Sequence, residues 1–200
     1  MVKYDVTEND GIINDIVEIH MKTFKGFFLT FLGKGFLKNL YWGFMKHRES
    51  GIVVAIDGKK IVGFCAYSSN LSNFYKFILR KRLFHFAWYA VGAFIRRPSI
   101  LLRLLRAFKR SEESKSEDEY IELSSIGVEP QCKNMGIGSG LIDKLVEISK
   151  STTCRYIKLE TDKKNNEFAN LFYIKNGFVL ERSYFTPEGR EMNEYRFYLE

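Results

Sequence analysis

Residues 128–140 combine glycines with basic and polar side chains in an order that suits the binding of an anion. The stretch reads Val-Glu-Pro-Gln-Cys-Lys-Asn-Met-Gly-Ile-Gly-Ser-Gly and lies between an expected strand and an expected helix. The first amides of a helix have no intrahelical acceptor and lie at the positive end of the helix dipole, so they can bind a phosphate group. The absence of side chains at Gly136 and Gly138 would let a pyrophosphate approach those amides. A glycine-rich turn without a ligand is the alternative.

Two familiar phosphate-binding loops do not match this stretch. A dinucleotide-binding loop, G-x-G-x-x-G, follows the first strand of a parallel sheet, whereas these glycines lie about two-thirds along the chain. A P-loop needs G-x-x-x-x-G-K followed by Ser or Thr, and the sequence contains no such run. Both nucleotide-binding folds are therefore excluded.

Hydrophobic periodicity predicts the elements that would position the loop. Alternating apolar residues and apolar runs indicate strands over Val2–Val6, Gly51–Ile56, Ile61–Tyr67, Glu119–Val128, Arg155–Thr161, Phe178–Phe185 and Met192–Leu199. Apolar residues at helical spacing indicate helices over Gly11–Lys22, Phe36–Met45, Gly138–Ser149 and Glu167–Asn176. Asp57-Gly58 predicts a hairpin turn, and Gly177 is expected to end the last helix in a left-handed conformation. Because residues 119–161 form a strand–helix–strand unit, we expect a mixed sheet in an α/β fold.

Two motifs resemble those of the GCN5-related N-acetyltransferase (GNAT) family. The glycine loop is similar to that family's coenzyme A loop, V-x-P-x-x-[R/Q]-x-x-G-x-[G/A], with Lys133 where the family usually has Arg or Gln. A lysine meets pyrophosphate as a point charge, without the planar fork of arginine. Residues 166–178 are similar to the family's N-x-x-A-x-x-[L/F]-Y-x-x-x-G-F helix. The resemblance is specific over Glu119–Phe178 and implies an α/β (α+β) fold with a mixed, mostly antiparallel central sheet flanked by helices.

The resemblance implies that acetyl-CoA is the cosubstrate and that no metal takes part. It implies that the strands ending at Val128 and Thr161 splay apart, so that pantetheine pairs with backbone groups of Ile126 and Val128. A backbone N–H of the loosened strand would stabilise the oxyanion. The coenzyme-binding residues implied in this way are Ile126, Val128, Lys133, Asn134, Met135, Gly136, Ile137, Gly138, Ser139, Asn166 and Lys175.

Three side chains are candidates for proton transfer. Tyr173 stands at the family's general-acid position, where its phenol would protonate the leaving thiolate, or it is a packed core aromatic. The incoming amine must lose a proton, and Glu122 is the first candidate base, because strand alternation puts it on the face of Ser124 and Ile126. A solvated or salt-bridged carboxylate is the alternative there. His20 is the second candidate base, or it is a hydrogen-bonded core histidine.

Two groups of residues are candidates for contact with the acceptor. They are Phe27, Phe28 and Phe31 in one group, and Arg190, Asn193 and Tyr195 in the other. In the fold that the resemblance implies, the aromatic loop overhangs the acceptor site, where its rings suit a sugar or an aryl group and equally suit core packing. The second group follows the turn at Pro187 and could hydrogen-bond an anionic or hydroxylated acceptor, or it is the exposed polar part of a hairpin.

The positive charge of the chain is concentrated in one segment. The formal net charge is +7, but residues 73–110 hold ten basic side chains and no acidic one. Pro98 divides two amphipathic helical stretches there, so we expect a basic helical insertion between the third and fourth strands, followed by an acidic loop over residues 111–119. The insertion could lie on an anionic membrane, bind a phosphorylated or lipid-linked acceptor, pair two subunits of a homodimer, or pack as a lid on its own domain.

The amino-acid composition limits the classes of protein to which the chain can belong. With 46% apolar and 16% aromatic residues, the 200-residue chain can form one core, so residues 1–200 are expected to form a single domain. No apolar run reaches the ~18 residues of a membrane span, and Met1–Asp10 lacks the pattern of a secretion signal. A cytoplasmic location, or one peripheral to the inner face of the membrane, is therefore expected. Three separated cysteines argue against disulfides and zinc, and no nucleic-acid recognition pattern accompanies the basic segment.

The sequence thus predicts transfer of acetyl from acetyl-CoA to a primary amine of a small molecule. A looser resemblance to acetyltransferases of bacterial surface-polysaccharide synthesis makes an amino sugar the expected acceptor. The alternatives are a protein N-acetyltransferase and a non-catalytic adaptor that binds anionic lipid or a partner through the basic segment.

Overall fold

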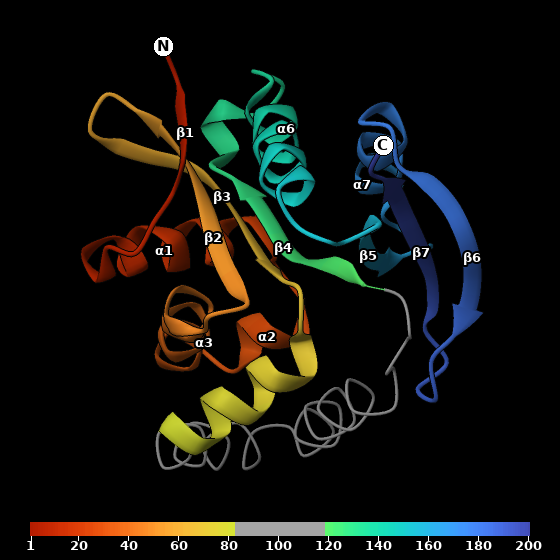
Figure 1. Ribbon diagram of the computed structural model, residues 1–200, viewed down its shortest axis with the longest axis horizontal. Coiled ribbons are helices and arrows are strands. Elements are labelled where there is room, and N and C mark those ends of the chain that lie inside the picture. Colours follow the sequence, from red (N-terminus) through yellow and green to blue (C-terminus); the bar gives the residue numbers. More distant parts are fainter. Residues whose placement is uncertain (83–118) are drawn as a thin grey trace.

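Seven strands of the described residues form one mixed sheet in the order β1-β2-β3-β4-β5-β7-β6, running from left to right in Figure 1. The computed structural model describes residues 1–82 and 119–200. The strands are β1 (Lys3–Val6), β2 (Ser50–Asp57), β3 (Lys60–Ser68), β4 (Tyr120–Val128), β5 (Tyr156–Asp162), β6 (Val179–Phe185) and β7 (Glu191–Tyr198). The helices are η1 (Asp10–Ile12), α1 (Ile13–Thr23), α2 (Phe28–Phe31), α3 (Lys34–Lys46), a helix over 71–82, η2 (Pro130–Cys132), α6 (Ile137–Lys150) and α7 (Glu167–Lys175).

Neighbouring strands are antiparallel except for β4 and β5, which are parallel. The predicted mixed, mostly antiparallel sheet is therefore confirmed. The parallel pair arises because α6 returns the chain to the same end of the sheet, as a strand–helix–strand unit requires. Gly177 has a φ of 84°, so the predicted left-handed end of the last helix is also confirmed.

The two faces of the sheet are covered by different helices and form two hydrophobic clusters. One cluster joins α1 and α3 to the sheet, with Ile16, Leu37 and Phe64 among its fully buried members. The other joins α6 to the opposite face, with Leu141 and Leu145 fully buried. The spacing of these residues within α1, α3 and α6 follows the helical period, which puts their apolar side chains on one stripe of each helix.

The first part of the predicted insertion packs on the domain itself. In the helix over 71–82, Phe74 and Ile78 are buried, and the Phe74 ring stacks on Phe44 with 4.2 Å between centroids. A Cβ atom at Gly43 would lie 2.3 Å from Ile78, so glycine permits this close approach. The remainder of the insertion and most of the acidic loop lie outside the described residues. None of the helices in the described ranges is long and apolar enough to cross a membrane.

Candidate functional site

The sheet opens between β4 and β5. The two strands pair only from Tyr120 opposite Tyr156 to Glu122 opposite Lys158. Beyond those three rungs β4 continues beside β3, and β5 continues beside β7 as far as Asp162. In Figure 1, β4 begins beside β5 and runs away from it toward the start of α6. The predicted separation of these strands is confirmed.

The backbone of β4 directs polar groups into this gap. The Glu129 N–H donates to the Val62 carbonyl of β3 at 2.8 Å, so the N–H of Glu129 points toward β3 and away from the gap. Because backbone groups of alternate residues point the same way, Ile126 and Val128 turn theirs toward the gap. The Val128 carbonyl accepts a hydrogen bond from the Thr23 hydroxyl at 3.2 Å, so one of the groups expected to pair with pantetheine already has a partner in the protein.

The loop before α6 leaves the start of that helix open. Asn134 and Gly136 have left-handed φ angles of 62° and 76°, and α6 begins at Ile137 with no side chain capping its amides. A Cβ atom at Gly136 would meet nothing within 4 Å, so this side of the loop faces open space. Lys133 is exposed beside it. These features fit the binding of a phosphate group at the helix start.

Gly138 has a second structural reason to be glycine. A Cβ atom there would lie 2.9 Å from the Phe172 ring of α7. Its missing side chain therefore lets α6 and α7 approach each other, in addition to any access that it gives to a ligand. Asn166, just before α7, donates from Nδ2 to the Thr161 hydroxyl at 2.6 Å and so ties α7 to the end of β5.

The remaining residues of the implied coenzyme site differ in exposure. Met135 and Lys175 are exposed, whereas Ser139 is half-buried in the first turn of α6. The side chain of Ile137 is buried in the cluster under α6, so only its backbone is available to a ligand. The loop residues of the predicted set thus lie between the end of β4 and the first turn of α6.

Tyr173 lies on the α6 side of the sheet. Its ring packs against Phe178 and Tyr195, with centroids 5.8 and 6.0 Å away. Burial, and then the Cys65 thiol, raise the pKa of the Tyr173 phenol, so it carries its proton at neutral pH. Cys65 is opposite Ile126 in the β3–β4 ladder, which places Tyr173 close to the gap.

The predicted common face of Glu122 and Ile126 is wrong. The β3–β4 register shifts by one residue at Ser124, so Glu122 is opposite Ser68 while Ile126 is opposite Cys65. Ser68 and Cys65 are three residues apart and therefore point to opposite faces of β3. A β-bulge reverses the alternation of side chains along a strand. Glu122 accordingly lies on the face that α1 and α3 cover, away from Tyr173.

Glu122 belongs to a group of charges on that face. The Lys158 ammonium lies 3.7 Å from the Glu122 carboxylate and 3.4 Å from that of Glu160. Burial acts to lower the pKa of Lys158, but the two carboxylates outweigh it and raise the pKa, so the lysine is charged. Tyr75, from the helix over 71–82, lies near the same carboxylates, and burial followed by their charge raises its pKa. These contacts match the salt-bridged alternative for Glu122.

His20 is buried between α1 and α3. Its Nδ1 atom is 2.6 Å from the Tyr41 hydroxyl, and its ring packs on Phe24. Burial lowers the pKa of His20 from 6.5 to about 4, so the imidazole is neutral at neutral pH. The ring is enclosed within the protein, as expected for a hydrogen-bonded core histidine.

The second group of predicted acceptor residues has partners inside the protein. Arg190 forms a two-pronged ion pair with Asp162, at 2.8 and 2.7 Å from one guanidinium nitrogen. Asn193 and Tyr195 are buried, and both donate to the Asn170 side chain of α7 at 2.8 Å. The alternative of exposed hairpin polarity is therefore wrong for Asn193 and Tyr195, and their contact with an acceptor stays a prediction. They tie β7 to α7.

The first group lies in the loop between α1 and α3. Phe27 and Phe31 are 39% and 44% exposed. The side chain of Phe28 lies outside what the structure describes. The Phe27 ring contacts Phe24, with centroids 5.6 Å apart. Through Phe24 this aromatic loop adjoins His20, on the same face of the sheet as Glu122.

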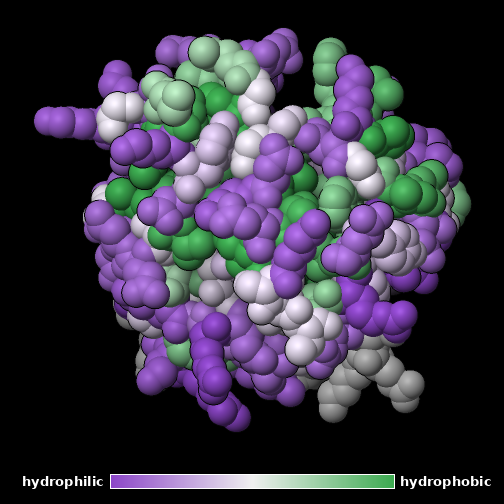
Figure 2. All heavy atoms as spheres, turned by 45° about the horizontal axis from the view of Figure 1, so that its top comes forward, coloured by the Kyte–Doolittle hydropathy of each residue, from purple (hydrophilic) through white to green (hydrophobic). Residues whose placement is uncertain are grey.

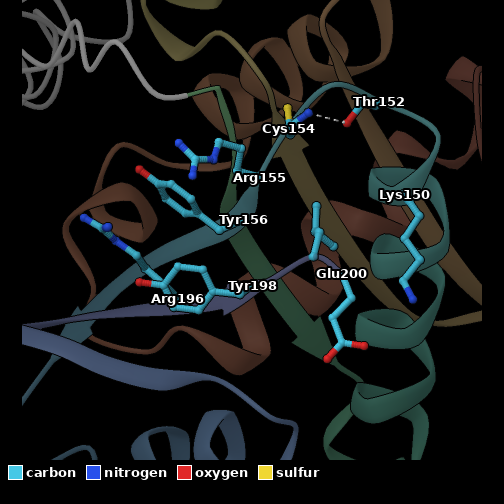
Figure 3. Close-up of a pocket in the computed structure, with 9 residues that line it drawn as sticks. Lys150, Thr152, Cys154, Arg155, Tyr156, Arg196, Tyr198 and Glu200 are labelled. Atoms are coloured by element: carbon cyan, nitrogen blue, oxygen red, sulfur yellow. Dashed lines mark hydrogen bonds between the residues drawn. The ribbon is translucent and has the colours of Figure 1, made fainter.

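A cavity of about 470 Å³ lies at the other end of β5, away from the gap. Figure 3 shows Lys150, Arg155 and Arg196 around it, contributed by α6, the start of β5 and β7. Its remaining lining residues are Thr152, Cys154, Tyr156, Tyr198, Leu199 and Glu200. This cavity is separate from the site at the wide end of the gap. Among the described residues, no cluster of three His, Cys, Asp or Glu side chains is placed to hold a metal.

Four side chains near the gap are not identified by patterns in the sequence. They are Thr23, Tyr41, Ser125 and Lys158. Lys158 carried a signal, because it stands between the apolar, buried Ile157 and Leu159 in β5. Each of the other three lies beside an element that is distant in the sequence. No local pattern identifies such a contact.

Comparison with known proteins agrees with this geometry. The model of the acetyltransferase (GNAT) family matches residues 13–178. A protein from Desulfovibrio desulfuricans assigned to the GNAT acetyltransferases has a similar structure, with a TM-score of 0.68, 15% identity and full coverage of both chains. The ribosomal-protein-S18-alanine N-acetyltransferase of Escherichia coli gives 0.59 at 13% identity, covering 100% of this chain and 94% of its own.

A third similar structure contains the coenzyme. It is a protein from Bacillus anthracis assigned as a streptothricin acetyltransferase and solved with acetyl coenzyme A, with a TM-score of 0.53, 18% identity, and coverage of 80% of this chain and 68% of that one. No curated protein matches the sequence significantly. The family match spans the gap, the loop and both helices around them, and the chain belongs to the GNAT family of acetyltransferases.

Proposed function

We propose that this protein transfers acetyl from acetyl-CoA to a primary amine of a small molecule. The observation that carries the proposal is the juxtaposition of two features. One is the gap that opens after Glu122 and Lys158, and the other is the uncapped start of α6 at Ile137. A diphosphate and an extended pantetheine chain need such a helix start and such an unpaired strand edge together.

The residues of this chain supply distinct functions toward the coenzyme. The amides after Gly136 and the exposed Lys133 would hold the diphosphate. Backbone groups of Ile126 and Val128 would align the pantetheine as an added strand, and an N–H of this stretch would face the carbonyl oxygen. Acetyl-CoA supplies the thioester that the amine attacks.

Protons would move on opposite faces of the sheet. Tyr173, protonated and on the α6 side, would give its proton to the departing thiolate. The amine would lose its proton toward the other face, where Glu122 and His20 both lie.

An amino sugar is the acceptor that we propose. The half-exposed rings of Phe27 and Phe31 offer apolar walls for a sugar ring. The carboxylates of Glu122 and Glu160 lie on the same face as this aromatic loop and would attract an ammonium group, although Lys158 already offsets part of their charge.

Release of free thiol from acetyl-CoA tests the proposal. Purified protein is mixed with acetyl-CoA and a panel of amino sugars, polyamines and peptides with free amino termini, and thiol is measured with a chromogenic disulfide. We expect release that depends on an amino sugar. Release with peptides alone would favour a protein N-acetyltransferase. No release and no binding of acetyl-CoA by calorimetry would contradict the proposal.

A further inference from the structure

The sheet ends in β6, whose outer edge pairs with no other strand of the described residues. At the end of β6, the Thr186 N–H donates to the carbonyl of Arg190, just before β7, at 2.8 Å. Backbone groups of alternate residues in an antiparallel strand point the same way. Those of Tyr184 are therefore directed to β7, whereas the N–H and carbonyl groups of Ser183 and Phe185 point outward.

The edge of β6 lacks most of the features that keep edge strands from pairing. Natural edge strands are often short, or carry lysine, proline or a bulge. β6 has seven residues without lysine or proline, and its bulge lies near its start, between Leu180 and Arg182. At the opposite edge, β1 has four residues and includes Lys3. The regular end of β6 is thus the edge that is better suited to accept another strand.

Beside this edge, α7 exposes an apolar stripe. Phe168, Leu171 and Ile174 are spaced three residues apart, which places them along one side of the helix, and each is more than half exposed. Figure 2 shows hydrophobic atoms on this side of the molecule, which α7 and β6 occupy in Figure 1. An exposed apolar patch of this kind next to an open strand edge is typical of an interaction surface.

The stripe and the strand edge lie at the same level and on the same face. The Ser183 hydroxyl donates to Asn193 Oδ1 at 2.7 Å, and Asn193 Nδ2 donates to Asn170 Oδ1 of α7 at 2.8 Å. The side chain of Ser183 therefore lies on the α7 face, and that of Phe185, two residues on, shares this face. Because Asn170 is level with Ser183, the first turn of α7, with Phe168, lies beside the outward backbone groups.

The charged side chains of β6 are already paired within one copy of the chain. Arg182 Nε donates to the buried carboxylate of Glu194 at 2.9 Å. The Glu181 carboxylate accepts from the Tyr198 hydroxyl at 3.1 Å and lies 3.6 Å from the Arg196 guanidinium. A partner on this edge would therefore cover no uncompensated charge of the strand.

We propose that two copies of this chain associate about a twofold axis through the outer edges of β6 and the apolar stripes of α7. In an antiparallel pairing centred on Tyr184, Ser183 is opposite the partner's Phe185, and the two residues exchange N–H···O bonds. The same axis brings Phe168 and Phe185 of both copies together on the α7 face.

A second copy fits this surface better than a lipid surface does. An antiparallel strand edge is complementary to itself, and a stripe at the same level becomes self-complementary under the same twofold axis. Lipid would offer no partners for the outward N–H and carbonyl groups of β6. The strand order also places β7 between β6 and β5, so the proposed contact leaves the gap between β4 and β5 free.

The exposed area is of the size that a stable dimer needs. Phe168 and Phe185 are 94% and 68% exposed. Since an aromatic side chain presents about 150–250 Å², the two rings together expose about 300 Å² per copy. Leu171, Ile174, Leu180 and the strand backbone add to this area, so the contact approaches the ~800 Å² per partner of a standard interface.

Sedimentation velocity over a range of micromolar concentrations tests the α7 layer. We expect the wild type to have twice the mass of the chain at the high end of the range. Phe168→Glu should raise the dissociation constant of the dimer about 10²-fold, because it removes apolar area and brings two carboxylates together near the axis. Val6→Glu is the matched control, since Val6 is a 41% exposed apolar residue at the other edge of the sheet, and it should leave the dimer unchanged.

Two changes at Phe185 test the strand layer. Phe185→Ala removes the ring and keeps the outward N–H, whereas Phe185→Pro removes both, and proline is tolerated at an edge position whose N–H faces away from the sheet. We expect the proline variant to dissociate more readily than the alanine variant. In the wild type, amide hydrogen exchange at Ser183 and Phe185 should be slow at high concentration and become faster on dilution, whereas Tyr184 should stay protected at both.

A wild type that remains monomeric at high micromolar concentration would overturn the proposal. A dimer that neither Phe168→Glu nor Phe185→Pro weakens would also overturn it, because its interface would lie elsewhere, as in pairing through the basic segment. Thermal unfolding checks that each variant is folded, and if Phe185→Pro fails to fold, Phe168→Glu and the exchange at Ser183 decide. These measurements do not use acetyl-CoA, so a negative result would leave the proposed function intact.

Discussion

Single side chains on the two faces of the sheet have different chemistry, and Tyr173 is the clearest case. Its phenol carries its proton at neutral pH even at the ordinary pKa near 10, burial raises that pKa further, and the side chain lies near Cys65 beside the gap. We predict that Tyr173→Phe lowers kcat about 10²-fold and leaves the dissociation constant of acetyl-CoA nearly unchanged, because only the proton is lost. Thiol release and calorimetry measure the two quantities. The reverse pattern would make Tyr173 a binding residue.

His20 gives a prediction about stability rather than rate. Its pKa falls from 6.5 to about 4 on folding because of burial, so the unfolded chain binds more protons between these pH values. The free energy of unfolding should therefore decrease as pH falls from 6.5 toward 4, by about 3 kcal/mol from this one group. In His20→Gln the decrease should be smaller. Denaturant unfolding at pH 7, 6 and 5 measures it, and equal slopes for both proteins would contradict the prediction.

The elements around the gap could mostly be predicted from the sequence, but their junctions could not. Periodicity located β4 and also α6, which buries one regular stripe, whereas α7 has no buried residue and its end is indicated by Gly177. The bulge at Ser124 was missed because serine there carries no signal of a changed alternation, and Glu122 was assigned to the wrong face in consequence. The hydrogen bond between Tyr41 and His20 joins α3 to α1, and such a contact depends on tertiary packing alone.

The loop that opens α6 yields a prediction at the scale of elements. Gly136 and Gly189 have similar left-handed φ angles, 76° and 77°, and both have open space where a Cβ would lie. Alanine at either position should cost about 1 kcal/mol of unfolding free energy, because a side chain is strained in this conformation. Only Gly136→Ala should also weaken acetyl-CoA binding. Equal effects of the two changes on binding, measured by calorimetry, would separate the loop from the coenzyme site.

The surface of the whole molecule has two unusual regions. Figure 2 shows hydrophobic atoms on the right, the side that α7 and β6 occupy in Figure 1, where Phe168, Leu171 and Val179 are each more than half exposed. The other region is the described part of the basic segment, which lies in the helix over 71–82. Its described apolar residues are used within the core, whereas Lys76, Arg80 and Lys81 are exposed.

The basic segment yields a prediction for the intact chain. We predict that the protein sediments with vesicles that contain anionic lipid and is released as salt rises from about 0.1 to 1 M, because the Debye length shortens from about 10 to 3 Å. Vesicles of neutral lipid are the control. Binding that is equal on both kinds of vesicle, or that persists in high salt, would contradict an electrostatic contact.

The brevity of the β4–β5 ladder affects how the molecule fluctuates. Three rungs and the Lys158–Glu122 ion pair join β1–β4 to β5–β7 within the sheet, so this seam is its weakest line. Amide hydrogen exchange should therefore be faster at the unpaired edges of β4 and β5 than in the β2–β3 ladder beside them. A coenzyme bound between β4 and β5 would connect the two parts of the sheet. Its binding should therefore slow amide hydrogen exchange in both strands together. The two parts of the sheet, which move relative to each other without the coenzyme, would then move as one body.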